Sequence, residues 1–240
     1  GGGGGPPPAG GGARGDRDRL DWRVALFTAT NRNAIRFRAT QNRFESFFDN
    51  IDKTRQRGIE IGLGWHILST LLLSADYTYL DAEFRDDFVV SSPNHPVRIP
   101  DPADPGETIP APETQQVESG DRIPLIPKHI FSLGVDWKAT DRLAVGADVQ
   151  GNSEQIFRGD ESNTDPEQVD GFAIVSAHAS FAITEYLSVF VRGINLLDKD
   201  YETFGVYGEA DEVLPAATDN PRFIGPGAPR AFWAGVELDL

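Results

Sequence analysis

In the ten residues AFWAGVELDL, Ala231–Leu240, every second side chain is apolar. The apolar positions are Phe232, Ala234, Val236, Leu238 and Leu240, and Glu237 and Asp239 fall between them. Period-two alternation is typical of a β-strand with one apolar and one polar face. The apolar face must lie against an apolar surface, so this stretch predicts a strand that borders either a core or a lipid phase.

The same alternation recurs along the chain, while helical periodicity is almost absent. It predicts seven clear strands, which are the closing stretch and Gly58–His66, Leu71–Leu80, Phe131–Lys138, Leu143–Gln150, Phe172–Ile183 and Leu187–Gly193. Two weaker strands are expected around Val24–Thr30 and Ala34–Phe37, which gives nine in total. The fold class is therefore predicted to be all-β and antiparallel.

A soluble β-sandwich also alternates apolar and polar residues, but three features favour a transmembrane barrel. The polar faces mix Gly, Ser, Ala and charged residues, as in a wide lumen. Aromatic residues gather at both strand ends, with Trp65, Trp137 and Tyr186 at one end and Tyr77, Tyr79 and Phe84 at the other. Short turns also alternate with long polar loops, namely 85–128, 151–171 and 196–230, as in an up-and-down barrel with short turns on one side.

This interpretation assigns the strand residues to two environments. The apolar set meets lipid, and the polar set lines the lumen. The lumen-facing candidates are Glu60, Asp76, Asp136, Asp148, His178, Arg192 and Glu237.

Composition narrows the functional classes. The chain of 240 residues has a formal net charge of −15, which argues against nucleic-acid binding, and it has no cysteine, which excludes disulfides and thiolate metal sites. No catalytic motif occurs, so no enzyme activity, cofactor or metal site is predicted. Residues 1–20 are Gly- and Pro-rich and are expected to be disordered, whereas 21–240 form the barrel portion. The absence of methionine predicts a fragment or a processed product.

Five segments, in order, resemble the carboxy-terminal part of TonB-dependent outer-membrane receptors. They are FFDNIDKTRQRGIEIGL (47–63), SADYTYLDAEF (74–84), IPLIPKH (123–129), GINLLDKDYETFG (193–205) and GAPRAFWAGVELDL (227–240). The resemblance implies a 22-stranded barrel in the outer membrane of a Gram-negative bacterium, of which this chain carries about nine strands. It implies uptake of a scarce bulky ligand, most often a ferric siderophore, with TonB acting through an N-terminal plug part that this chain lacks.

The same resemblance implies further partners. Gly235, Leu238 and Leu240 resemble the signal read by the barrel-assembly machinery, with leucine in place of the usual terminal aromatic residue. Outer-membrane lipid and lipopolysaccharide are expected to surround the barrel.

Ligand recognition is expected on the long loops, because binding residues concentrate on loops held by a rigid scaffold. A guanidinium group suits the carboxylates or catecholates of a ferric siderophore. The candidates are His95 and Arg98, then Arg158, Asp160, Glu161 and Asn163, then Tyr201 and Tyr207. The alternative for each group is an ordinary loop, in which Gly, Asp and Asn form turns and aromatic residues pack the loop.

Three other functions are weighed against uptake. A passive porin-like channel shares the barrel but has no plug domain upstream. A soluble β-rich carbohydrate-binding module would stay in solution without detergent. An outer-membrane enzyme requires a nucleophile–His–acid cluster on the lumen face, where only His178 is available.

Overall fold

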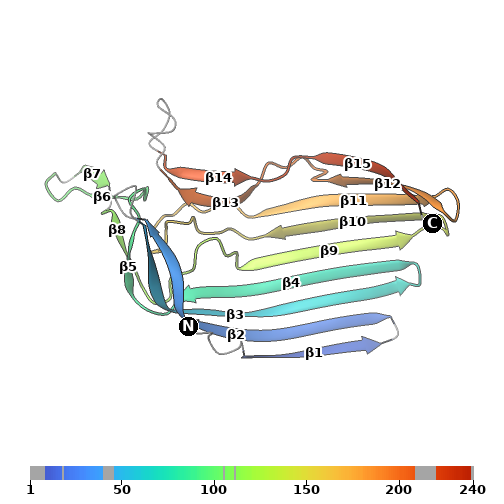
Figure 1. Cartoon of the computed structure of the whole chain (residues 1–240), viewed down its shortest axis with the longest axis horizontal. Helices are drawn as coiled ribbons and strands as arrows, with labels where there is room; N and C mark the ends of the chain where they lie inside the picture. Colours follow the sequence, from blue (N-terminus) through green and yellow to red (C-terminus); the bar gives the residue numbers. More distant parts are fainter. Residues whose placement is uncertain are drawn as a thin grey trace.

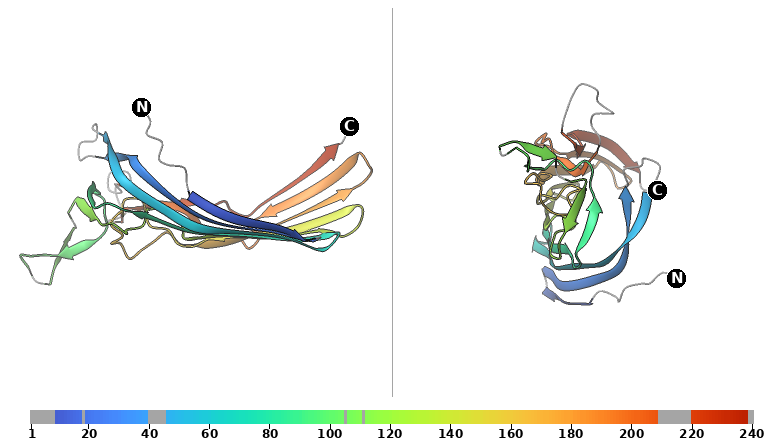
Figure 2. Two further views of the ribbon diagram at one scale, coloured as in Figure 1. Left: turned by 90° about the horizontal axis from the view of Figure 1, so that it is seen from below. Right: turned by 90° about the vertical axis from the view of Figure 1, so that its left-hand side faces the viewer.

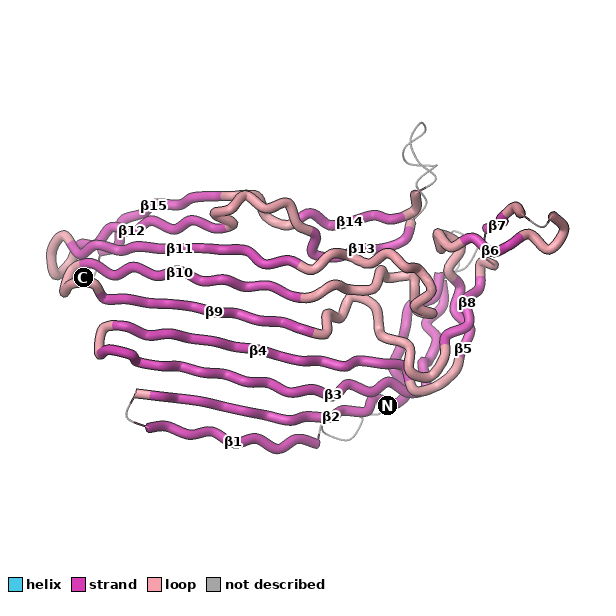
Figure 3. Tube along the Cα trace, turned by 180° about the vertical axis from the view of Figure 1, so that it is seen from behind, coloured by secondary structure: helices cyan, strands magenta, loops and turns pink. Residues whose placement is uncertain are grey.

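The structure is a computed structural model, and it describes residues 9–17, 19–39, 46–104, 106–110, 112–208 and 220–238. Nine strands form one antiparallel sheet in the order β1-β2-β3-β4-β9-β10-β11-β12-β15 (Figures 1 and 3). Their bounds are β1 Ala9–Arg17, β2 Leu20–Ala39, β3 Ser46–Leu68, β4 Leu71–Phe84, β9 His129–Lys138, β10 Leu143–Asn152, β11 Phe172–Ala182, β12 Leu187–Ile194 and β15 Ala231–Leu238. The predicted all-β antiparallel class is confirmed.

The predicted number of nine strands is right for this sheet, but two of its members differ from the prediction. The two weak strands around Val24–Thr30 and Ala34–Phe37 are one continuous strand, β2. The ninth strand is instead β1, which lies in the Gly-rich segment that the composition predicted to be disordered. Backbone pairing explains the difference, because β1 pairs with β2 from Ala9↔Thr28 to Arg17↔Leu20, and a ladder of main-chain hydrogen bonds does not depend on side chains.

Three small hairpins occupy two of the long loops. β5 (Phe88–Ser91) pairs with β8 (Thr114–Val117), β6 (Arg98–Pro100) with β7 (Thr108–Pro110), and β13 (Glu202–Tyr207) with β14 (Arg222–Pro226). All three lie at one end of the sheet, and the short turns after β3, β9 and β11 lie at the opposite end (Figure 1). The predicted segregation of short turns from long loops is therefore confirmed.

The strand register keeps the apolar residues on one side of the sheet, called here the apolar face. Ile61 pairs with Tyr77, Leu73 with Val135, Val145 with Ala179, and Val191 with Ala234, and directly opposed residues point to the same side. Large side chains on this face remain exposed, with Leu133 at 52% and Val236 at 64%. In a soluble protein so much contiguous apolar surface would have to be covered, so the face fits contact with lipid.

Aromatic residues mark the two borders of the apolar face. Trp65 and Trp137 lie near the short turns, where they pair with Leu73 and Leu71. Tyr77 and Tyr79 lie toward the loops beside His129, whose Nδ1 is 2.8 Å from the Tyr77 hydroxyl. From Leu71 to Tyr79 the strand rises about 27 Å, which fits an apolar band of about 25 Å crossed by tilted strands.

Phe84 was expected in the upper aromatic row, and this expectation is wrong. Its even position on β4 places it on the opposite, polar face, where it is 1% exposed and packs with Val117. Phe88, Val90 and Ile123 surround this pair. Phe84 therefore anchors the loop hairpin β5–β8 to the sheet.

The sheet is not flat. Viewed along the strands it bends into an arc, and viewed from the side the strands themselves curve (Figure 2). β1 and β15 are the edges of the described sheet. Among the described residues, no helix has the length and apolar character that crossing a membrane requires.

Gly146 and Gly64 form a matched pair of polar-face glycines with different surroundings. A Cβ at Gly146 would lie 2.3 Å from His178 Cε1 and 2.7 Å from Asp136 Oδ1, whereas at Gly64 the nearest atom is 3.8 Å away. In detergent, Gly146→Ala should lower the unfolding temperature by an amount equivalent to at most about 1 kcal/mol, because the atoms that it displaces are the ends of the half-exposed His178 and Asp136 side chains. Gly64→Ala should leave it unchanged or slightly raised, because alanine favours strands more than glycine. Equal effects of both substitutions on heat-modifiable migration would contradict this explanation.

Candidate functional site

The polar face carries all seven residues predicted to line the lumen. Asp136, His178 and Arg192 lie in one cross-strand row, through the pairs Asp136↔Gly146, Gly146↔His178 and His178↔Arg192. Asp76 pairs with Gly62, Asp148 with Gly134, Glu60 with Thr78 and Glu237 with Ser188. Their common face is as predicted, and its role as a lumen wall stays a prediction.

Two polar side-chain contacts on this face, one of them an ion pair, reach across an intervening strand. Arg23 Nη2 lies 2.6 Å from Asp76 Oδ1, above Gly62, and His178 Nε2 lies 3.2 Å from Asp136 Oδ1, above Gly146. A side chain at either glycine would fill the space that the pair occupies. All four partners are about half exposed or more, so these pairs arrange the wall and add little stability.

A recess of about 390 Å³ opens on the polar face below the long loops. Its polar lining comes from strand residues Asp76, Thr78, Gln150 and Asn152, together with Thr203 of β13. Phe172 and Tyr201 form an aromatic side of the recess, with ring centroids 4.4 Å apart. The recess is too small for a whole bulky chelate, but it could accept one arm of such a ligand.

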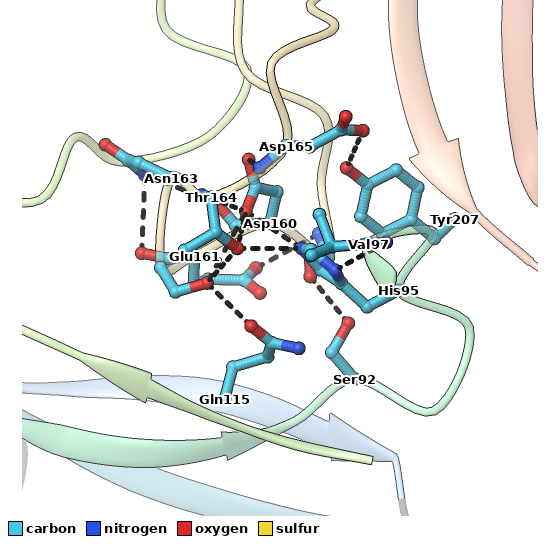
Figure 4. A network of polar contacts seen from close by, with 12 residues as sticks. Ser92, His95, Val97, Gln115, Asp160, Glu161, Asn163, Thr164, Asp165 and Tyr207 are labelled. Atoms are coloured by element: carbon cyan, nitrogen blue, oxygen red, sulfur yellow. Dashed lines mark hydrogen bonds and ion pairs between the residues drawn. The ribbon is translucent and has the colours of Figure 1, made fainter. Parts of the chain in front are cut away.

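Above the recess, the long loops are joined by a buried polar network centred on Asp160 (Figure 4). Asp160 is 1% exposed, and its Oδ1 accepts hydrogen bonds from His95 Nε2 at 3.0 Å and from the Thr164 amide at 2.8 Å. The Val97 amide donates to His95 Nδ1 at 3.3 Å, which leaves Nε2 as the ring nitrogen that bonds Asp160. Two loops distant in sequence are thereby joined through one carboxylate.

A second carboxylate of loop 151–171, that of Asp165, binds loop 196–230. Arg222 of β14 binds Asp165 in bidentate fashion, with Nη2 to Oδ1 at 2.7 Å and Nε to Oδ2 at 3.0 Å. The Tyr207 hydroxyl also donates to Asp165 Oδ2 at 2.6 Å, and its ring stacks on Phe157. The Asp165 side chain is 1% exposed, so this pair is buried between loops.

The ionisation of this cluster follows from those contacts. Burial alone would raise the pKa of Asp165, but the hydrogen bonds from Arg222 and Tyr207 outweigh it and hold that pKa below its ordinary value. Burial and the hydrogen bond to Asp165 raise the pKa of Tyr207, so its phenol stays protonated as a donor. Burial would lower the pKa of Arg222, and the bond to Asp165 raises it instead.

Asn163 and Glu161 complete the connections of loop 151–171. Asn163 adopts a positive φ of 54°, accepts a hydrogen bond from the Arg122 amide at 2.7 Å and donates to the Arg122 carbonyl at 3.0 Å. Asparagine tolerates this left-handed conformation better than most residues. Glu161 is 4% exposed and accepts from the Gly159 amide.

The eight predicted ligand contacts therefore divide into two groups. His95, Asp160, Glu161, Asn163 and Tyr207 lie together in the loop network, where their polar atoms bind other loop residues. Arg98 bonds Thr108 across the β6–β7 hairpin, and Tyr201 accepts a hydrogen bond from the Ala228 amide while lining the recess. Arg158 is exposed next to the buried cluster, and only its backbone pairs with β13. Arg158 and Tyr201 are thus the best placed of the eight to contact a ligand.

Sequence reasoning missed several members of the network. Asp165, Arg222, Gln115 and Ser162 are all bonded inside it, with Ser162 donating to Gln115 at 2.8 Å. Residues 165 and 222 lie far apart in the chain, so no local pattern could have joined them. Among the described residues, no cluster of three or more His, Cys, Asp or Glu side chains could hold a metal ion.

Gly235 and Leu238, predicted to belong to an assembly signal, are on opposite faces of β15. Gly235 leaves room for the ring of Phe190, since a Cβ there would lie 2.5 Å from Phe190 Cζ. Leu238 is on the apolar face and is 65% exposed. Leu240 lies outside the described residues.

Comparisons with known proteins give a consistent result. A family model described as TonB dependent receptor-like, beta-barrel, matches residues 11–196. A probable TonB-dependent siderophore receptor, PiuA, of Acinetobacter baumannii is 26% identical over 158 residues, which are 65% of this chain and 18% of that protein. An iron-regulated outer membrane virulence protein of Vibrio cholerae is 20% identical over 189 residues, 79% of this chain and 22% of that protein. The chain thus spans about a fifth of the length of these curated relatives.

Solved structures match the fold over almost the whole chain. The ferric yersiniabactin uptake receptor FyuA of Yersinia pestis aligns with a TM-score of 0.68 at 15% identity, covering 97% of this chain and 29% of that one. The copper transporter OprC aligns with a TM-score of 0.66 at 17% identity, covering 96% and 30%. At these identities the agreement establishes the fold alone.

Arg222→Gln should open the contact between loop 196–230 and loop 151–171. The substitution leaves the buried Asp165 carboxylate without its cation, at a cost of about 3 kcal/mol. Amide hydrogen exchange of β13 and β14 should accelerate strongly. Arg230→Gln is the matched control, because the Arg230–Asp198 pair at 2.9 Å is about half exposed and should contribute little. Similar exchange rates in the two variants would rule out Asp165–Arg222 as the connection.

The depressed pKa of Asp165 predicts how this contact depends on pH. A carboxyl whose folded pKa lies below the ordinary value of 3.8 contributes its full stabilisation above pH 3.8 and loses it as the pH falls through the folded value. Protease sensitivity of the 196–230 loop should therefore stay constant from neutral pH down to about pH 4 and rise only below it. Opening that began near pH 6 would implicate a group other than Asp165.

Proposed function

Because the chain belongs to the TonB-dependent receptor family, as a segment of its outer-membrane β-barrel, we propose that it forms wall and outer loops of a receptor for ferric siderophores. Membership rests on a family model that spans well over half of the chain. The family is not enzymatic, in agreement with the prediction from sequence. The alternative of a soluble carbohydrate-binding module is wrong, since members of this family reside in the outer membrane. The alternative of a passive channel has less support than TonB-dependent uptake, because the matching family is named for TonB dependence.

Support for iron as the cargo comes from the relatives. One is named a siderophore receptor and another an iron-regulated outer-membrane protein. Fold relatives include receptors named for ferric catecholate, ferric yersiniabactin and ferric citrate. These names describe those proteins, and they make an iron chelate the best-supported ligand class here.

The observation in this chain that carries the proposal is the buried polar network of Asp160 and Asp165, which joins the long loops above the recess. Asp160 and Asp165 fix three loops to one another, so exposed groups beside them keep defined positions. β13 holds the backbone of Arg158, and its exposed guanidinium suits the planar anionic groups of a siderophore. The aromatic side formed by Phe172 and Tyr201 offers a surface for a flat ligand arm.

The proposal includes the partners that such uptake needs. TonB would supply energy through the N-terminal part of the receptor, and the barrel-assembly machinery would read the last strand at Gly235 and Leu238. Lipid and lipopolysaccharide would surround the apolar face, whose exposed residues include Leu133 and Val236.

Copper is the second candidate cargo, because the copper transporter OprC shares the fold over nearly the whole chain. The two cargoes can be separated by uptake of radioactive iron presented as a siderophore and radioactive copper presented as the free ion. Uptake of copper without uptake of iron would contradict the siderophore proposal and would leave the family membership unchanged.

Arg158→Ala should weaken binding of a ferric siderophore by about ten-fold, since a hydrogen bond to a charged group is worth about 1.5–3 kcal/mol. Arg98→Ala is the matched control, because its guanidinium is already bonded to Thr108 in the β6–β7 hairpin. Binding is measured on the full receptor with a panel of catecholate, hydroxamate and carboxylate siderophores. Unchanged affinity of Arg158→Ala for every siderophore that the wild type binds would remove Arg158 from the site.

A further inference from the structure

The side of the sheet that bears the apolar face changes character abruptly above its upper aromatic row. On β3 the apolar residues end at Ile59, and the next residues on the same side are Arg57, Arg55 and Lys53. On β4 Tyr77 and Tyr79 are followed by Asp81, Glu83 and Arg85. The change falls in the same cross-strand rows on both strands, because Ile59 pairs with Tyr79 and Arg57 with Asp81.

Neighbouring segments extend this basic patch. Arg32 of β2 pairs with Lys53, and Arg122 pairs with Glu83 from the other side, so their side chains point to the same side of the sheet. The basic patch thus consists of Arg32, Lys53, Arg55, Arg57, Arg85 and Arg122 around two carboxylates, Asp81 and Glu83. Six cations against two anions form a local excess of positive charge in a chain whose net charge is −15.

The two carboxylates order the arginines without neutralising them. Arg57 binds Asp81 at 2.8 Å, and both Arg55 and Arg85 bind the same oxygen of Glu83. Asn163 fixes the backbone of Arg122 through two hydrogen bonds, so loop 151–171 also holds this part of the patch. The guanidinium groups of Arg55, Arg57 and Arg85 are therefore positioned in advance of any ligand.

Two donors of the patch have no acceptor within the described part of the chain. Arg55 Nε and Arg122 Nη2 are buried from solvent, and neither has a hydrogen-bond partner. A buried donor without an acceptor is costly, and both flank the same residue, Glu83. An additional anionic oxygen at this position would satisfy them.

We propose that the basic patch binds the phosphate groups of a lipid A molecule in the outer leaflet of the outer membrane. The patch begins directly above the Tyr77–Tyr79–His129 row, which marks the loop-side border of the apolar band. Acyl chains would lie along the apolar face below this row, and phosphates at the level of Arg55 and Arg57 would accept charge-assisted hydrogen bonds. This contact goes beyond ligand uptake, and it depends only on the placement of the chain in the outer membrane.

The full receptor, delipidated in detergent, is titrated with diphosphoryl lipid A and with its dephosphorylated form, and bound lipid is counted by native mass spectrometry. The wild type should retain the diphosphoryl form better, and Arg55→Gln/Arg122→Gln should lose about ten-fold in its affinity. The double variant Arg142→Gln/Arg230→Gln, which removes two arginines outside the patch, should bind as the wild type does.

Heat-modifiable migration verifies that each variant has assembled. If Arg55→Gln/Arg122→Gln fails to assemble, Arg32→Gln/Arg57→Gln tests the same patch from its exposed residues, with the same expected loss. Equal retention of the two lipid forms by the wild type would overturn the proposal. So would wild-type affinity in every assembled patch variant, or displacement of lipid A by millimolar inorganic phosphate, which would indicate a site for the free ion.

Discussion

The pairing of the peptide backbone is the constraint on which this structure depends. In hydrocarbon no water can satisfy an unpaired N–H or C=O group, so a chain that crosses a membrane in extended form must pair every strand with a neighbour. The nine-stranded antiparallel ladder does this on both sides of every described strand between β1 and β15, and on one side of those two edge strands. Because strand side chains alternate with period two, the same ladder separates an apolar face from a polar one along every strand.

Charged residues have different roles on the polar face and in the loops. On the polar face, ion pairs such as Arg23–Asp76 lie over glycines, remain solvated and organise a wall. In the loops, Asp160 and Asp165 are almost fully buried, and each is matched by several donors. A buried carboxylate is tolerable only when it is paired in this way, so these residues tie the loops together beside the small apolar cluster of Phe157, Val169 and Tyr207.

That arrangement explains why charged loop residues need not be ligand contacts. Acidic and aromatic residues in long outer loops fit recognition by composition, yet His95, Asp160 and Tyr207 are buried. His95 is hydrogen-bonded to Asp160, and the ring of Tyr207 packs edge-on against His95. Their effect on a ligand is indirect, because they hold the loop backbone that carries exposed neighbours such as Arg158. Rigid loops lower the entropy lost when a ligand binds, which is the physical advantage of such a buried network.

The sequence by itself determined the all-β class, the two faces, the separation of short turns from long loops, and the family resemblance. All of these depend on residue order within one strand or one segment, and the alternation through Tyr77 and Tyr79 is visible without any partner. Only the tertiary structure decided that Ala9–Arg17 is a strand, since glycine-rich sequence carries no side-chain pattern and its pairing partner supplies the order. It also decided that Asp165 meets Arg222, that Phe84 leaves the aromatic row for the loop core, and that Arg122 joins Arg55 beside Glu83. Those contacts join residues that are distant in sequence, and their energies depend on burial, which one strand read alone does not reveal.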